Sequence, residues 1–129
     1  MTMSSSVPYL IRAINEWILD NQLTPYLIVN ANVEDTSVPL EFVKDGEIVL
    51  NISPSAIRDL VMTNEHIMFS GRFGGIAREI YVPIVAVVGL IAKENGEGMW
   101  FPKDEEKPAP EPSKKKVPKK GPPSLKVIK

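Results

Sequence analysis

Few side chains in this 129-residue chain could perform catalysis or bind a metal. His66 is the only histidine, and the chain has no cysteine. A structural zinc site needs several Cys or His ligands, and a catalytic triad needs a nucleophile and an orienting acid beside the imidazole. The adjacent acids Glu34 and Asp35 fall in an expected loop, a pattern typical of solvated turn charge. Phosphate- and dinucleotide-binding motifs are also absent, so we expect no enzyme, no metal and no cofactor.

A glycine-rich segment is the more informative feature. Residues 71–76 read GRFGGI inside a region that otherwise has the pattern of a strand. Adjacent glycines weaken a sheet, and they are tolerated where the backbone bends or where another chain approaches it closely. One interpretation is a corner or bulge. The other is the floor of a groove for an extended peptide, with Arg72 facing acceptors or carboxylates and Phe73 and Ile76 offering apolar contacts.

The charge is distributed unevenly along the chain. Residues 1–102 hold six Lys and Arg against twelve Asp and Glu, whereas residues 103–129 hold nine Lys against four acids. An acidic domain argues against a nucleic-acid surface on the domain itself, because phosphate contacts need clustered cations. The N-terminus lacks the pattern of a signal peptide, and the longest apolar run, residues 82–92, is short for a membrane span. We therefore expect a cytoplasmic protein with no membrane partner.

The N-terminal region predicts one helix, over about residues 8–20. Apolar side chains recur there with the period of a helix, and Pro8 suits its first turn. They are Tyr9, Leu10, Ala13, Ile14, Trp17 and Ile18. This surface is large enough that one face could pack on the domain and another on a second copy of the chain. The alternative is a helix fully buried in a monomer.

Short β-branched segments follow the helix and predict strands. The expected strands are residues 26–33, 38–43, 47–52, 60–62, 66–73, 77–83, 85–93 and 98–101. Residues 85–93 are apolar almost throughout and could also form a short helix, but their β-branched content favours a strand. The sequence KDG at residues 44–46 predicts a turn that pairs the second strand with the third. The fold class is therefore mainly β with an N-terminal α-helix, in a small bent sheet or partly open barrel.

The composition changes at Pro102. Seven of the twelve prolines lie in residues 102–129. Such a sequence cannot bury enough apolar surface to offset its ordering entropy, so we expect a disordered Pro- and Lys-rich linker at residues 103–120. The folded domain would be residues 1–102. Residues 121–129 end in apolar side chains, which favours a short peptide that binds a partner.

Four stretches of the sequence together resemble SspB, the stringent starvation protein B family. They are PYLIRAINEWILDNQLTPYLIV, VPLEFVKDGEIVLNIS, FSGRFGGIAREIYVPIVAVVGLIAKENGEGMWF and SLKVIK. The resemblance implies a non-enzymatic adaptor. Such a protein binds the ssrA degradation tag, which tmRNA adds to polypeptides from stalled ribosomes, and delivers the tagged polypeptide to the ClpXP protease. It also implies an Sm-like β-barrel and a homodimer formed through the N-terminal helix.

The resemblance assigns roles to three sets of residues. The tag groove would involve Ala56, Arg72, Phe73, Gly74, Gly75 and Ile76, and the dimer interface Tyr9, Leu10, Ala13 and Trp17. The C-terminal peptide would dock on the N-terminal zinc-binding domain of ClpX through Leu125, Lys126, Val127, Ile128 and Lys129. The same resemblance leaves ribosome association open as a further contact.

An alternative function is an Sm-like RNA-binding protein with a basic tail, because barrels of this kind often bind RNA. The acidic balance of residues 1–102 counts against it, as does the lack of an aromatic and basic stacking platform. A peptide-binding module with partners beyond the ssrA tag is a milder alternative.

Overall fold

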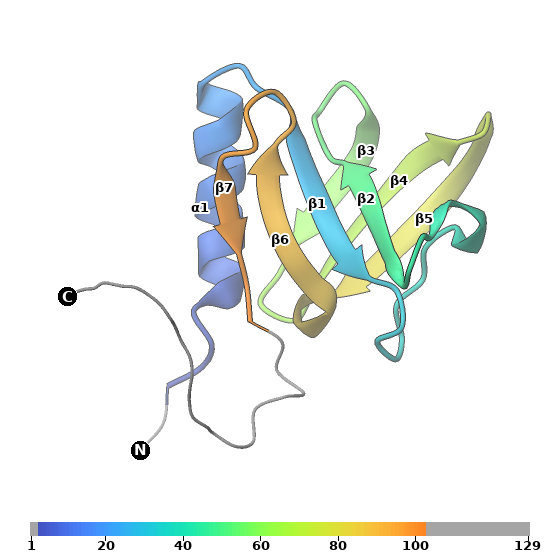
Figure 1. Cartoon of the computed structure of the whole chain (residues 1–129), viewed down its shortest axis with the longest axis horizontal. Coiled ribbons are helices and arrows are strands. Elements are labelled where there is room, and N and C mark those ends of the chain that lie inside the picture. The colour runs from blue at the N-terminus through green and yellow to red at the C-terminus, as the bar shows by residue number, and fades with distance from the viewer. Residues whose placement is uncertain (1–2, 103–129) are drawn as a thin grey trace.

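The computed structural model describes residues 3–102, and it begins with the expected helix (Figure 1). Helix α1 spans Val7–Asp20, with Pro8 in its first turn and Asn21 after its last. Ile11 and Ile18, seven positions apart, are 1% and 2% exposed and anchor the helix to the core. The prediction of a helix near residues 8–20 is thus confirmed. The helix packs against three strands of the first sheet, β1 (Pro25–Asn30), β6 (Val87–Ala92) and β7 (Gly98–Trp100).

The first sheet is antiparallel and has the strand order β2-β1-β6-β7. Its strands are β1 (Pro25–Asn30), β2 (Glu47–Asn51), β6 (Val87–Ala92) and β7 (Gly98–Trp100). In the register of this sheet, Leu27 lies opposite both Leu50 and Leu90, and all three side chains are 0% exposed. Alternation along each strand therefore points one row of apolar side chains into the core.

The second sheet is antiparallel and consists of β3 (Ile57–Met62), β4 (His66–Phe73) and β5 (Ile76–Pro83). Its inward-facing residues include Ile67 and Phe69 on β4 and Ile80 and Val82 on β5, and all four are buried. The short 3₁₀ helix η2, Ile84–Ala86, leads from β5 into β6 and so joins the two sheets. Both sheets contribute to a single hydrophobic core.

The two bent sheets face each other without closing into a barrel, and α1 lies at one end (Figure 1). The β4–β5 hairpin projects at the opposite end, so the helix and the hairpin tip are far apart in the molecule. This architecture confirms the expected fold class, mainly β with one N-terminal helix, and is consistent with an Sm-like arrangement. Within residues 3–102, no helix is long and apolar enough to cross a membrane.

The segment at residues 38–43 differs from the prediction. It was expected to be a strand paired with residues 47–52, but it contains the 3₁₀ helix η1, Leu40–Phe42, and β2 pairs with β1 instead. Pro39 lacks the N–H that a ladder needs, and Leu40 and Phe42 are exposed. The isolated bridges lie on either side of the segment: Ser37 exchanges two backbone hydrogen bonds with Tyr81, and Lys44 bridges to Glu47.

The turn expected at residues 44–46 is present. Lys44 and Glu47 exchange backbone hydrogen bonds of 2.8 and 2.9 Å, and Asp45 and Gly46 both have positive φ. Three other predicted strands shift at their boundaries. Strand β1 ends at Asn30, earlier than residue 33, because residues 31 and 32 form a turn. Strand β3 begins at Ile57, earlier than residue 60, and β6 begins only at Val87, because η2 occupies the start of the predicted segment.

Candidate functional site

A polar groove lies between the start of β3 and the paired ends of β4 and β5. Its volume is about 370 Å³. The β2–β3 loop and the first residues of β3 form one wall, and the last residues of β4 form the other. The lining residues are Pro54, Ser55, Ala56, Ile57, Arg58, Ser70, Gly71, Arg72 and Ala77. The structure therefore brings together Ala56 and Arg72, two of the residues that the sequence suggested for a peptide site.

The two adjacent glycines form the tip of the β4–β5 hairpin. Phe73 and Ile76 are the last paired residues, and Gly74 and Gly75 between them have φ of +63° and +82°. Positive φ at both central positions is the geometry of a type I′ turn, which matches the twist of the flanking strands. The glycines thus explain how the hairpin closes. They and Phe73 and Ile76 border the groove region without lining the groove itself.

Arg72 is held across this turn. Its Nη1 donates a hydrogen bond of 3.1 Å to the carbonyl oxygen of Gly75. The side chain is otherwise exposed at the groove. A guanidinium has five N–H donors in a rigid fork, so one bond to the turn orients the group and leaves most donors for a ligand.

The opposite side of the hairpin is packed, and sequence reasoning missed the residues that pack it. The Phe73 ring lies 6.0 Å from the Phe42 ring, in a tilted arrangement. Beneath it, a Cβ at Gly71 would lie 3.3 Å from Phe73 Cε1 and 3.5 Å from Ile57 Cγ2. Gly71 therefore lets Phe73 and Ile57 meet over the backbone of β4, which fixes one wall of the groove. Its place in an alternating strand was the only sequence signal for this role.

An ion pair links η1 to the β4–β5 hairpin. Arg78 on β5 pairs with Glu41 of η1, and its Nη1 also donates a 3.3 Å hydrogen bond to Glu41 Oε1. The hydrogen bond from Arg78 holds the pKa of the Glu41 carboxyl below its ordinary value. Both groups are partly solvated, so the pair adds little stability, and its effect is to tether η1 to the hairpin.

The residues suggested for a dimer interface form an outward stripe on α1. Tyr9 and Trp17 are 52% and 44% exposed, Ala13 between them is exposed, and Leu10 is half-buried. Arg12 lies over the Tyr9 ring at 4.9 Å and also donates to Asn64, which in turn donates to the Tyr9 hydroxyl. Arg12 and Asn64 thus order Tyr9, and about half of Tyr9 and of Trp17 remains as an exposed apolar surface on the helix.

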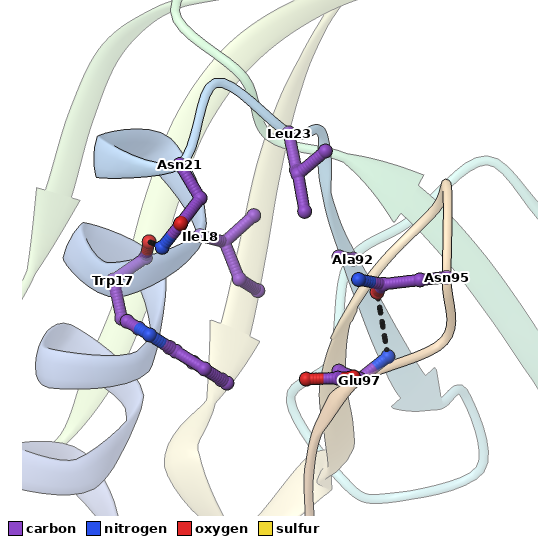
Figure 2. Close-up of a pocket in the computed structure, with 7 residues that line it drawn as sticks. All are labelled: Trp17, Ile18, Asn21, Leu23, Ala92, Asn95 and Glu97. Atoms are coloured by element: carbon purple, nitrogen blue, oxygen red, sulfur yellow. Dashed lines mark hydrogen bonds between the residues drawn. The ribbon is translucent and has the colours of Figure 1, made fainter.

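A small cavity of about 110 Å³ opens at the C-terminal end of this stripe. It lies between the end of α1 and the β6–β7 turn, and its lining residues are Trp17, Ile18, Asn21, Leu23, Ala92, Asn95 and Glu97. Figure 2 shows the Trp17 indole reaching from the helix toward the strands, and the hydrogen bond from Glu97 N–H to Asn95 Oδ1 that shapes the turn. The cavity is too small for an extended peptide and is separate from the polar groove.

The remaining candidates from the sequence are placed as follows. The His66 ring stacks on Tyr81 at 5.1 Å between centroids. Residues 3–102 contain no group of three or more His, Cys, Asp or Glu arranged to hold a metal ion. Leu125, Lys126, Val127, Ile128 and Lys129 lie outside the described residues, as does the expected linker.

Comparison with known proteins adds to this geometry. A family model described as stringent starvation protein B matches residues 5–129. The chain is also 49% identical over 98 residues to a stringent starvation protein B homolog of Haemophilus influenzae. That alignment covers 76% of this chain and 65% of the relative, so it spans just under two thirds of the relative's length. Because the family model covers nearly the whole sequence, the chain belongs to the stringent starvation protein B family.

Proposed function

We propose that this protein is a non-enzymatic adaptor of the cytoplasm. It binds the ssrA degradation tag in the polar groove and tethers the tagged polypeptide to ClpX for degradation by ClpXP. The observation that carries the proposal is the groove beside the β4–β5 hairpin, which Ala56 and an oriented Arg72 both line, in a chain of the stringent starvation protein B family.

The groove is suited to an extended peptide. Polar groups border it, from Ser55 of the β2–β3 loop and Ser70 of β4, beside the Arg72 guanidinium. Ala56 occupies the wall with a single methyl group, which leaves room for a backbone to approach. A peptide bound in this way gains affinity from backbone and charge-assisted hydrogen bonds rather than from a deep apolar pocket.

Delivery would follow from tethering. The domain holds the tag, and residues 121–129 dock on the N-terminal zinc-binding domain of ClpX through apolar Leu125, Val127 and Ile128 flanked by Lys126 and Lys129. A flexible chain of 17 residues, the length of residues 104–120, has an r.m.s. span of roughly 20–25 Å. That span places the tag near ClpX at an effective concentration on the order of mM.

Dimerisation would multiply this effect. Tyr9, Ala13 and Trp17 form an exposed apolar stripe on α1, with the half-buried Leu10 at its edge, and a self-complementary contact needs such a surface. A homodimer offers two tag grooves and two ClpX-binding peptides, so avidity increases without any new contact. Contact with the ribosome, where tagged polypeptides originate, is compatible with the same surfaces.

A binding titration tests the groove. Fluorescence anisotropy of a labelled ssrA peptide, titrated with the full chain, should show saturable binding of one peptide per subunit. Arg72→Gln should weaken binding about tenfold, because it removes a charge-assisted donor from the groove. Lys93→Gln, which removes a cation from the exposed β6–β7 turn, is the matched control and should bind as the unaltered protein does. Equal affinity of the two variants would contradict the assignment of the groove.

A further inference from the structure

We propose that Arg58 is a second specificity-determining residue of the groove, and that Arg58 and Arg72 together select peptides by their carboxylates. The inference rests on the proposed function, since it concerns the chemistry by which the same groove recognises its peptide. Nothing in the sequence pattern singled out Arg58.

The two guanidinium groups share one face of the second sheet. Arg58 on β3 lies opposite Ser70 on β4, and Arg72 is two residues further along β4, so both alternate to the same side. Diagonal neighbours of this kind are roughly 7–8 Å apart at the backbone, within reach of long side chains. Both residues line the groove, and none of the nine lining residues is acidic.

This placement does nothing for the stability of the domain. Residues 1–102 have twice as many acids as cations, yet two of the six cations stand side by side, where like charges repel. Arg12, Arg72 and Arg78 each donate a hydrogen bond to another residue. Among residues 3–102, Arg58 is the one arginine with no hydrogen-bond or ion-pair partner. A ligand carboxylate would relieve the repulsion and supply the missing partner, since the guanidinium fork matches its two oxygens.

A β-bulge sets the direction of Arg58. The register of β3 shifts between Arg58 and Val61, so that Asp59 and Leu60 together oppose Phe69. Arg58 and Val61 are three residues apart, and regular alternation would put them on opposite faces. With the bulge, both pair on the outer face while Ile57 and Met62 face the core.

The bulge depends on a backbone conformation that most residues avoid. Asp59 has φ of +58°, a left-handed conformation that L-residues adopt at a cost of about 1–2 kcal/mol. Bulges next to binding sites commonly re-aim a side chain, and strain retained at one position is a reason to look for a function there. Asp59, which has this strained conformation, directly follows Arg58, and the bulge that it forms directs the Arg58 side chain into the groove.

Glu79, an acid on the same face of the second sheet, allows a test with the opposite expected result. Glu79 on β5 lies across from Ser70 and is exposed, but it does not line the groove and makes no ion pair with either arginine. Its negative charge should repel a ligand carboxylate. Removing that charge should therefore tighten binding, whereas removing the charge of Arg58 should weaken it.

The experiment uses the full chain and anisotropy of a labelled ssrA peptide. Arg58→Gln should weaken binding about tenfold, Glu79→Gln should tighten it, and Lys93→Gln should leave it unchanged. All three side chains are exposed, so the variants should keep the fold, which circular dichroism can verify. The affinity of the Arg58→Gln variant should also depend less on salt than that of the unaltered protein.

Two altered peptides identify the source of the carboxylate. One carries amide side chains in place of every acidic one, and the other has an amidated C-terminus. If Arg58→Gln no longer changes the affinity for one of these peptides, that peptide lacks the carboxylate that Arg58 binds. The inference is overturned if the Arg58→Gln and Lys93→Gln variants bind the unmodified peptide with equal affinity. It is also overturned if Arg58→Gln weakens binding of both altered peptides as much as it weakens binding of the unmodified one. In either case the proposed function stands. If the unaltered protein fails to bind the ssrA peptide, the proposed function falls, and this inference with it.

Discussion

At the scale of single residues, Glu94 shows how an exposed carboxylate can fix the position of a turn. The backbone N–H of Thr24 donates to Glu94 Oε1 at 2.8 Å, and the Thr24 hydroxyl donates to Oε2 at 2.7 Å. These two bonds hold the pKa of the Glu94 carboxyl below its ordinary value of 4.5. They join the segment after α1 to the β6–β7 turn, beside the small cavity at the end of the helix.

The Glu94 contact predicts a pH-dependent change in stability. A carboxyl with a lowered pKa in the folded state stabilises the fold above its ordinary pKa, and this contribution is lost as the pH falls through the folded-state value. Glu94→Gln should therefore lower the melting temperature at neutral pH, and the difference from the unaltered protein should shrink as the pH falls below about 4. Thermal unfolding monitored by circular dichroism across this range checks the prediction. A difference that is the same at all pH values would show that the charge of Glu94 has no part in it.

Residues of the groove were only partly predictable from the sequence. The glycine-rich segment suggested Arg72 and the family resemblance suggested Ala56, and the structure places both in one groove. Arg58, Phe42 and Gly71 could not be found in the same way. Their roles depend on strand register, on a bulge and on a contact between distant segments, and a one-residue change in register would reverse the face of each side chain.

At the scale of elements, the β6–β7 hairpin contains two glycines with different roles. A Cβ at Gly98 would lie 2.1 Å from the carbonyl oxygen of Leu90, which is backbone and cannot move aside. A Cβ at Gly96 would have no heavy atom within 4 Å, although its φ of +74° would still be strained. The first glycine is required for the close approach of two strands, and the second only for a turn.

This difference predicts unequal effects of two matched substitutions. Gly98→Ala should destabilise the domain by about 1–3 kcal/mol or more, through overpacking against the β6 backbone. Gly96→Ala should cost only about 1 kcal/mol, from its left-handed φ. Urea unfolding of the two variants measures the difference. Equal losses of stability would mean that β7 shifts freely and that the close approach at Gly98 is not required.

The exposed stripe of α1 makes a prediction at the same scale. Ala13 lies between Tyr9 and Trp17 and is exposed, so Ala13→Glu should leave the fold intact and place a charge in the centre of the proposed dimer interface. We expect sedimentation velocity to show a dimer for the unaltered protein and a monomer for this variant. Val49→Glu adds the same charge at an exposed apolar position on β2 and should remain dimeric. If both variants are dimers, the dimer interface does not include Ala13 and lies on another surface of the protein.

The elements themselves were predicted well where the pattern was strong. The helical period gave α1, and β-branched runs gave the strands from β4 to β6. The segment at residues 38–43 has the same kind of composition but forms η1, because Pro39 interrupts the ladder and β2 already pairs with β1. Composition alone does not determine with which of two neighbouring segments a strand will pair.

At the scale of the whole molecule, the proposed activities belong to different parts of the chain. The groove is lined by residues of the β2–β3 loop, β3, β4 and β5, and the apolar stripe is on α1. The tip of the β4–β5 hairpin lies at the opposite end of the domain from α1 (Figure 1). The proposed ClpX-binding peptide, residues 121–129, is separate from both in the sequence. Because the groove and the stripe use different residues, the proposed adaptor could hold a tagged polypeptide and a second subunit at the same time.

The same separation explains what the sequence could say about function. The acidic balance of residues 1–102 and the basic balance of residues 103–129 were visible in the charge distribution, and the scarcity of His and Cys was visible in the composition. The division into a binding domain and a terminal peptide followed from these features and from the family resemblance. The groove's location relative to the helix required the three-dimensional arrangement of the two sheets.

Degradation of an ssrA-tagged reporter by ClpXP, at a substrate concentration below its KM, tests the central claim of tethering most directly. The full chain should accelerate degradation severalfold. A chain ending at residue 120 should bind the labelled tag with unchanged affinity and yet give no acceleration, because it lacks the ClpX-binding peptide. If the shortened chain accelerates degradation as well as the full chain does, delivery does not depend on residues 121–129, and the tethering account is wrong.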